Sequence, residues 1–198
     1  MPLKEKDFIE VEFVARDKET NRIFDLTNQE IAKKENIYSE NMTYGPIILC
    51  LGENQIIKGL DHFLIEKETK KEYTVEIKPE EGFGKKDAKL LRLIPLSTFK
   101  KQKIQPFPGL QVNIDGLFGT VRTASSGRAI VDFNHPLAGH ELVYNIKVNR
   151  IITDDKEKIT SLLDFFLKDP KISLDNNKLT IESKLPEPVQ KIIEEKIK

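Results

Sequence analysis

The sequence has few of the residues that catalytic and metal sites most often use. Among its 198 residues it contains one cysteine, three histidines and no tryptophan. A single cysteine excludes an intramolecular disulfide, and Cys50 lies in an apolar run, where we expect a small buried side chain. His135 and His140 are separated by Pro136 and Gly139, which break the helical spacing of a zinc site. We therefore expect no bound metal ion and no cofactor.

The sequence also lacks an excess of charge of either sign. Lys and Arg number 32, and Asp and Glu number 32, so the formal net charge is zero. A nucleic-acid-binding protein normally carries a basic excess that neutralises phosphates. No apolar stretch approaches the roughly 20 residues that cross a bilayer, and the first residues form no apolar signal core. We expect a soluble, cytoplasmic protein that binds neither nucleic acid nor membranes.

The first pattern that is present is an alternation of apolar and polar residues. Residues 8–16, 72–78 and 142–149 have this period of two, which is typical of half-buried strands. Residues 57–65 have apolar positions at helical spacing and predict a short helix that covers the sheet. Residues 29–35 predict one or two further helical turns. The pattern indicates an α+β fold, in which a helix covers an antiparallel sheet.

A different pattern interrupts this one in the middle of the chain. Strands are predicted at 90–94, 110–114, 120–124 and 129–133, with a helix at 96–102. Asp115-Gly116 is a strong hairpin signal between two of these strands. Because the alternating pattern resumes afterwards, we interpret the segment as a small β-rich domain that is inserted into a loop of the first domain.

The C-terminal residues form a third pattern. Apolar residues at helical spacing predict helices at 159–167 and 186–197, on either side of a hairpin at 172–181. A module of this α-β-β-α form is too small to bury both apolar stripes by itself. We expect it to form a homodimer through these stripes, and docking onto the rest of the chain is the alternative.

Five segments of the sequence resemble a known family when they are taken in order. They are Arg22-Ile-Phe-Asp25, Pro46-Ile-Ile-Leu-Cys-Leu-Gly52, Gln55-Ile-Ile-Lys-Gly-Leu60, Gly82-Phe-Gly84 and Val131-Asp-Phe-Asn-His-Pro-Leu-Ala-Gly-His-Glu-Leu142. The first four resemble the FKBP-type peptidyl-prolyl isomerases. The last resembles the SlyD-like branch, in which a small insert-in-flap chaperone domain interrupts the FKBP fold. The end of the chain is similar to the extra C-terminal domain of long archaeal members.

The resemblance implies a domain plan and an activity. It implies an FKBP domain at 1–86 and 132–153, an insert-in-flap chaperone domain at 87–131, and an accessory or dimerisation module at 154–198. The activity would be cis/trans rotation about X-Pro bonds during protein folding, and the partners would be unfolded or partly folded polypeptides that contain proline. The alternative is a non-catalytic chaperone whose prolyl pocket is vestigial.

The lack of catalytic groups agrees with such an activity. The sequence has no G-x-S-x-G motif, no phosphate loop and no paired nucleophile and base. Rotation about an X-Pro bond faces a barrier of roughly 18–20 kcal/mol, because the planar amide loses resonance. An apolar pocket can lower this barrier without a nucleophile, since it binds the proline ring and favours the less polar, twisted amide.

The resemblance assigns ten residues to this pocket. Those implied in catalysis are Phe24, Asp25, Ile57, Phe83 and Tyr144, and those implied in client binding are Phe13, Ile47, Ile56, Leu60 and Leu137. Ile57 would donate its backbone N–H to a client carbonyl, Leu60 would form the floor, and Asp25 would be the charged group at the edge.

Three positions of this pocket differ from the family, and one of them is Leu60, where the family often has tryptophan. The family usually has tyrosine where this chain has Phe13 and Phe83, so two hydroxyls are missing. One of them would bind the Asp25 carboxylate and the other the client backbone. A hydrogen bond of this kind contributes about 0.5–1.5 kcal/mol, so we expect reduced rather than abolished activity.

The inserted segment carries apolar residues near its turns and its helix. They are Leu96, Phe99, Phe107, Leu117 and Phe118. We expect some of them to form the core of the insert and others to hold unfolded chains. Binding a client there would raise its effective concentration at the proline pocket.

Overall fold

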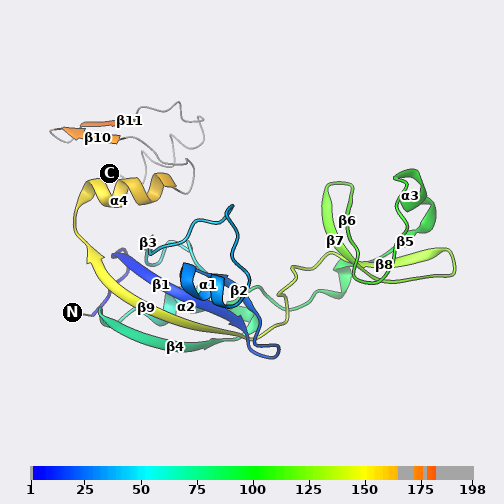
Figure 1. Ribbon diagram of the computed structural model, residues 1–198, viewed down its shortest axis with the longest axis horizontal. Coiled ribbons are helices and arrows are strands. Elements are labelled where there is room, and N and C mark those ends of the chain that lie inside the picture. Colours follow the sequence, from blue (N-terminus) through cyan, green and yellow to red (C-terminus); the bar gives the residue numbers. More distant parts are fainter. Residues whose placement is uncertain (1, 165–171, 176–177, 182–198) are drawn as a thin grey trace. The chain divides into compact units, whose positions relative to one another are not determined.

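The computed structural model describes residues 2–164, 172–175 and 178–181. The chain divides into two compact units, one made of residues 1–77 and 142–198 and the other of residues 78–141 (Figure 1). The second unit is therefore an insertion in the chain of the first. Within the described ranges, no helix is both long enough and apolar enough to cross a membrane.

A five-stranded sheet forms the centre of the first unit (Figure 1). Its strands are β1 (Phe8–Asp17), β2 (Ile23–Leu26), β3 (Ile47–Cys50), β4 (Lys71–Ile77) and β9 (Leu142–Ile152). β9 and then β4 lie on one side of β1. On its other side, β3 pairs with the beginning of β1 and β2 pairs with its end, and every pair is antiparallel. The prediction of an α+β fold with antiparallel strands is confirmed.

Burial along these strands follows the alternation that the sequence shows. In β1 the buried apolar residues are Ile9, Val11, Phe13 and Ala15, and in β9 they are Leu142, Tyr144, Ile146, Val148 and Ile152. A slip of one residue in either strand would turn this whole apolar set to the other face. The alternating pattern therefore determines which face of the sheet is buried.

The two short helices of the first unit cover opposite faces of the sheet. α2 (Lys58–Leu64) packs on the buried alternating face, where the rings of Phe63 and Tyr73 meet with 6.0 Å between their centroids. α1 (Gln29–Lys34) packs through Ala32 against an apolar cluster of β2 on the other face. Both helices agree with the sequence prediction.

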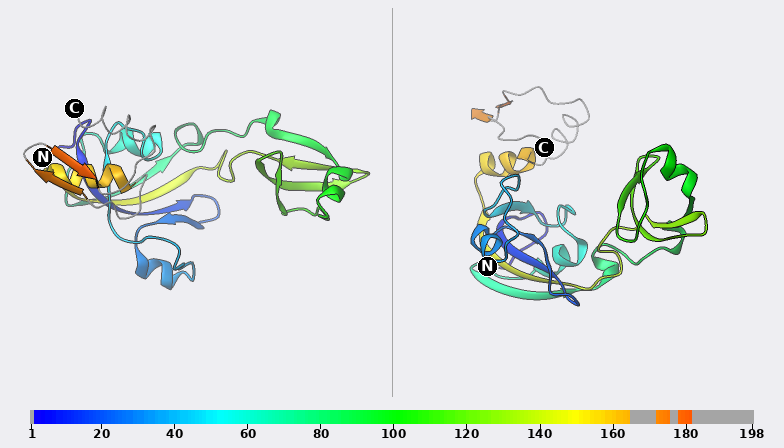
Figure 2. Two further views of the ribbon diagram at one scale, coloured as in Figure 1. Left: turned by 90° about the horizontal axis from the view of Figure 1, so that it is seen from above. Right: turned by 45° about the vertical axis from the view of Figure 1, so that its right-hand side comes forward.

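The second unit contains a four-stranded antiparallel sheet with its own core (Figure 2). Its elements are the 3-10 helices η1 (Pro79–Glu81) and η2 (Ala88–Leu90), the strands β5 (Leu91–Pro95), β6 (Gln111–Ile114), β7 (Leu117–Ser125) and β8 (Arg128–Asp132), and the helix α3 (Leu96–Lys101). The strand order is β5-β8-β7-β6. Asp115 and Gly116 both have positive φ in the turn between β6 and β7, as the hairpin signal predicts.

Hydrogen bonds join the two ends of the second unit. Asn134 accepts the N–H of Asp87 at 2.8 Å and donates its amide to the Asp87 carbonyl at 3.1 Å. The N–H of Gly139 donates to the carbonyl of Gly84 at 2.8 Å. Asn134, Gly84 and Gly139 lie outside residues 87–131, and the compact unit is accordingly wider than that range. As the limits of a functional domain, 87–131 stays a prediction.

The first unit continues after β9 into α4 (Asp155–Asp164) and a hairpin of β10 (Ile172–Asp175) and β11 (Lys178–Ile181). Ile159, Leu162 and Leu163 of α4 are buried, so the described part of the predicted apolar stripe is covered within the chain. Arg150 of β9 forms an ion pair with Glu157 of α4. The helix predicted at 186–197 lies outside the described residues, and the homodimer stays a prediction.

Candidate functional site

A bulge in β2 sets the direction of two residues that the sequence analysis assigns to the site. The register of β2 on β1 shifts between Ala15 and Arg16, so β2 advances by two residues where β1 advances by one, and Phe24 is the extra residue. The ring of Phe24 meets the ring of Tyr144, while Asp25 lies in the same row of paired residues as Tyr144. Strict alternation would have sent these two neighbours to opposite faces.

Three aromatic rings form the centre of the candidate site, and we call Phe13, Phe24 and Tyr144 the aromatic group. The centroids of Phe13 and Tyr144 are 5.8 Å apart with tilted rings, and those of Phe24 and Tyr144 are 6.0 Å apart in a T-shaped pair. Such offset arrangements are favoured between aromatic side chains. The hydroxyl of buried Thr27 accepts the N–H of Phe13 at 2.9 Å and fixes the backbone below the rings.

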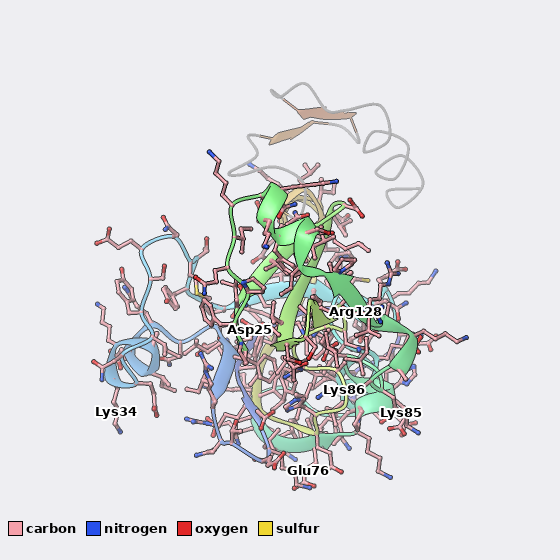
Figure 3. The ribbon with its side chains drawn as sticks, turned by 90° about the vertical axis from the view of Figure 1, so that its right-hand side faces the viewer. Asp25, Lys34, Glu76, Lys85, Lys86 and Arg128 are labelled. Carbon is pink, nitrogen blue, oxygen red and sulfur yellow. The ribbon has the colours of Figure 1, made fainter. Side chains whose placement is uncertain are left out.

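Asp25 lies in the same row of paired residues as Tyr144, and its side chain is exposed. Figure 3 labels Asp25 among the side chains of the molecule. Partial removal of water by the surrounding protein raises the pKa of this carboxyl, and the backbone N–H of Leu26 opposes the rise. Burial, and to a lesser degree the charge of Asp25, raises the pKa of the Tyr144 hydroxyl. The phenol therefore keeps its proton at neutral pH, and the site offers apolar rings, one hydroxyl and one carboxylate.

The loop between β3 and α2 carries Ile56 and Ile57. It is held by Asp61, whose side chain is 3% exposed and accepts the N–H of Gly52 at 2.9 Å and that of Asn54 at 3.4 Å. Among the hydrogen bonds of the described residues, the N–H of Ile57 donates none. It is therefore able to donate to a bound carbonyl.

The remaining assigned residues of the first unit differ in exposure. Ile47 begins β3 and is 37% exposed, whereas Leu60 of α2 is 1% exposed, as expected of a residue beneath a pocket. The ring contacts join the three members of the aromatic group. The aliphatic residues Ile47, Ile56, Ile57 and Leu60 lie on β3, on the following loop and on α2 of the same unit.

Phe83 and Leu137 belong to the second unit, where His135 contacts both of them. The rings of Phe83 and His135 are stacked, with 4.2 Å between centroids and 5° between planes. The Nδ1 of His135 accepts the N–H of Leu137 at 3.1 Å. The sequence suggested His135 only as a metal ligand, and its packing role could not be predicted, because stacking between distant segments leaves no local pattern. Among the described residues, no group of three His, Cys, Asp or Glu side chains could hold a metal ion.

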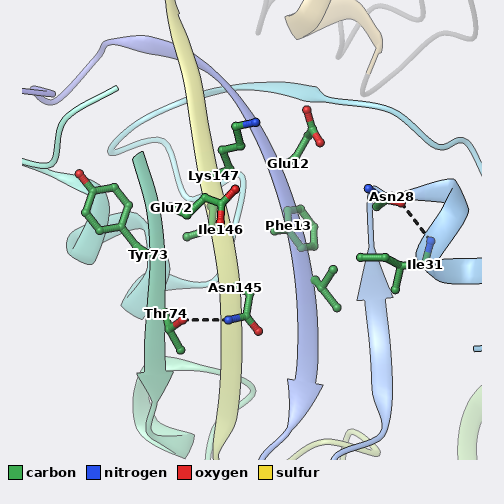
Figure 4. A pocket seen from close by; sticks show the side chains of 11 residues that line it. Glu12, Phe13, Asn28, Ile31, Glu72, Tyr73, Thr74, Asn145, Ile146 and Lys147 are labelled. Atoms are coloured by element: carbon green, nitrogen blue, oxygen red, sulfur yellow. Dashed lines mark hydrogen bonds between the residues drawn. The ribbon is translucent and has the colours of Figure 1, made fainter. Parts of the chain in front are cut away.

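A separate hollow of about 380 Å³ lies on the other face of the sheet, beside α1 (Figure 4). Lys147 stands in its centre, paired across the strands with Glu12 on one side and Glu72 on the other. The amide of Asn145 donates to the hydroxyl of Thr74 at 2.8 Å. Polar and charged groups supply most of the lining, so the hollow is not the apolar pocket that the sequence predicts.

Comparisons with known proteins give matches to two families. Residues 2–99 match the family described as FKBP-type peptidyl-prolyl cis-trans isomerase, and residues 92–137 match the one described as FKBP26, IF domain.

Several known proteins are also similar to this chain. It is 30% identical over 155 residues to the short-type peptidyl-prolyl cis-trans isomerase of Methanocaldococcus jannaschii, which is 78% of this chain and 98% of that protein. It is 27% identical over 117 residues to the FKBP-type peptidyl-prolyl cis-trans isomerase SlyD of Helicobacter pylori, over 57% of this chain and 62% of that protein. The solved structure of the three FKBP domains of wheat FKBP73 is 14% identical, with a TM-score of 0.41 over 78% of this chain and 42% of that one.

A surface of apolar rings with few polar groups is able to favour a twisted amide over a planar one without a covalent step. The chain belongs to the FKBP-type peptidyl-prolyl cis-trans isomerase family, as the match to the Methanocaldococcus jannaschii enzyme over nearly all of that protein shows. The family and the enzyme class expected from the sequence are confirmed. The roles of the individual residues stay predictions.

Proposed function

We propose that this isomerase works with two sites. The aromatic group and Asp25 of the first unit bind the proline of a client, meaning an unfolded or partly folded polypeptide. The second unit holds apolar segments of the same client and keeps its prolines near the isomerase site. Prolonged contact of this kind raises the effective concentration of each X-Pro bond.

The isomerase part of the proposal is supported by the composition of the site. Phe13, Phe24 and Tyr144 supply an apolar surface for the proline ring, with Asp25 at its edge. The N–H of Ile57 supplies a donor for a carbonyl next to the proline. Ile47 and Ile56 extend this surface and buried Leu60 supports it from beneath, and Phe83 and Leu137 of the second unit are proposed to contact the same client.

The chaperone part rests on one observation, which is the exposure of large apolar side chains in the second unit. They are Leu91, Leu93, Phe107, Leu117 and Phe118, and Phe118 is 78% exposed. Exposed apolar surface of this kind usually marks a site that binds another chain. By contrast, Phe99 is buried in the core of this unit and Leu96 packs against it. Five apolar residues of the insert were expected to divide between core and surface. Leu96 and Phe99 belong to the core, and Phe107, Leu117 and Phe118 lie on the surface.

The chaperone part can be tested with exposed residues alone, because their replacement leaves the core intact. Phe107→Ser combined with Phe118→Ser should leave kcat/KM on a proline tetrapeptide unchanged. Catalysed refolding of a protein limited by proline isomerisation should fall about tenfold or more. The matched control is Ile37→Ser with Met42→Ser, which removes two exposed apolar side chains from the first unit. Equal losses in both variants would refute a separate client-binding site.

The isomerase site can be tested in the same assay. Asp25→Ala combined with Phe24→Ala should lower kcat/KM on the tetrapeptide, while Cys50→Ser, at a buried thiol, should leave it nearly unchanged. Activity at the wild-type level in the double variant would show that the aromatic group is not the site. A wild-type protein without any acceleration would favour the alternative of a non-catalytic chaperone.

A further inference from the structure

A row of paired residues crosses three strands of the sheet at the candidate site. Ala15 of β1 pairs with Asp25 of β2 on one side and with Tyr144 of β9 on the other. Residues paired in this way point to the same face. Adjacent strands are about 4.8 Å apart, so Asp25 and Tyr144 face each other across the width of one strand, with a methyl group between them.

The contacts around this row hold the Tyr144 ring in place. Ala15 is fully buried although its side chain is only a methyl group, so larger neighbours close over it. The rings of Phe13 and Phe24 both contact the ring of Tyr144, and they leave it little freedom to turn. The position of Phe24 in the bulge also places Asp25 in the row with Tyr144.

The two polar ends of the row act on each other electrostatically. The charge of Asp25 contributes to the raised pKa of the Tyr144 hydroxyl, so this hydroxyl remains a hydrogen-bond donor. Phe13 and Phe24, the other two members of the aromatic group, have no polar side-chain group. Tyr144 is therefore the member of the aromatic group that is able to donate to Asp25.

A bound client would change the solvation of the Asp25 carboxylate. In the free protein Asp25 is exposed, and water solvates its charge. A proline ring placed on the aromatic group would remove part of this water, and an ionised carboxylate without a donor is strongly destabilised in apolar surroundings. A hydrogen bond in those surroundings is stronger than in water.

We propose that Tyr144 is a positioning residue for Asp25, and that its hydroxyl donates a hydrogen bond to the Asp25 carboxylate, across Ala15, when a client covers the site. The hydrogen bond keeps the carboxylate ionised and fixed in direction while the X-Pro bond turns. This inference rests on the proposed function, because it takes the aromatic group and Asp25 as the prolyl site.

The first test is a double-mutant cycle in the full chain. Tyr144→Phe keeps the ring and removes the hydroxyl, and it should lower kcat/KM on a proline tetrapeptide about three- to tenfold. Asp25→Asn should lower it at least as much, and the double variant should be no slower than Asp25→Asn alone. The matched control is Tyr73→Phe, which removes a hydroxyl from β4 that is bonded to the Glu68 backbone. The factors by which Tyr73→Phe and Asp25→Asn lower kcat/KM should multiply in the double variant, as expected for residues that do not interact.

A second measurement separates positioning from packing. The carboxyl carbon of Asp25 is followed by NMR as a function of pH, with saturating proline peptide. Tyr144→Phe should raise the pKa of Asp25 in the bound protein, because a hydrogen bond to the ionised form stabilises that form. A purely structural role of Tyr144 would leave this titration unchanged.

The outcomes distinguish this inference from the proposed function. Multiplying effects of Tyr144→Phe and Asp25→Asn, or an unchanged Asp25 titration, would overturn the inference while the prolyl site stands. Wild-type kcat/KM in Asp25→Asn would overturn both, since Asp25 would then have no part in the reaction.

Discussion

The carboxylate of Asp61 offers the sharpest test of how the isomerase site is built. It is 3% exposed and accepts the N–H groups of Gly52 and Asn54, at 2.9 and 3.4 Å, in the loop that leads to Ile56 and Ile57. Replacement by alanine leaves two backbone donors of this loop without their acceptor. We therefore expect Asp61→Ala to weaken both the fold and the placement of the Ile57 N–H.

The two effects have different sizes. Hydrogen bonds to charged groups contribute about 1.5–3 kcal/mol, and the bond at 3.4 Å is the weaker of the pair, so the unfolding free energy should fall by about 2–4 kcal/mol. A misplaced Ile57 N–H would lose one neutral hydrogen bond to the client, about 0.5–1.5 kcal/mol. Because about 1.4 kcal/mol corresponds to a factor of ten, kcat/KM should fall about two- to tenfold.

A second buried aspartate provides the control. Asp17 is 4% exposed and accepts the N–H and the hydroxyl of Thr20, at 2.8 and 2.9 Å, in the turn between β1 and β2. Asp17→Ala should lower the unfolding free energy in urea by a similar amount and leave the peptide kcat/KM unchanged. The reasoning would be refuted if both variants lost the same activity, or if Asp61→Ala lost stability and no activity.

Three further predictions concern the rest of the chain. Gly119→Ala should destabilise the second unit by about 1–3 kcal/mol in urea, because its methyl would lie 2.7 Å from the nearest side-chain carbon, and a neutral result would mean that the strands yield there. Burial opposes ionisation of Asp132, but hydrogen bonds from Asn134 and Arg122 outweigh it and lower its pKa. The stability that the ionised Asp132 gains from Asn134 and Arg122 should therefore be present above about pH 4 and be lost as the pH falls through the lowered pKa. Unfolding followed by circular dichroism should show this pH dependence in the wild-type protein and lack it in Asp132→Asn. Light scattering should give a dimer for the full chain and a monomer for a 1–153 truncation, and a monomeric full chain at tens of micromolar would reject the dimer.

The sequence by itself determined the main strands of the first unit, the buried faces of β1 and β9, and the family. Alternation along β1 and β9 is a property of neighbouring residues, so it could be read without knowing what packs on them. The same holds for the Asp115-Gly116 turn, whose conformation depends on the residues themselves. The order of the short motifs was enough to indicate the isomerase family, because such segments recur at the same places in one fold.

Only the tertiary structure decided how the site residues meet. The bulge at Phe24 depends on the register between β1 and β2, which no local period specifies, and it brings Phe24 and Asp25 into reach of Tyr144. The stacking of Phe83 on His135 joins segments on either side of the inserted sheet. The exposure of Leu93 is likewise invisible in its apolar run, because neighbouring residues encode a strand while distant ones decide which of its faces is covered.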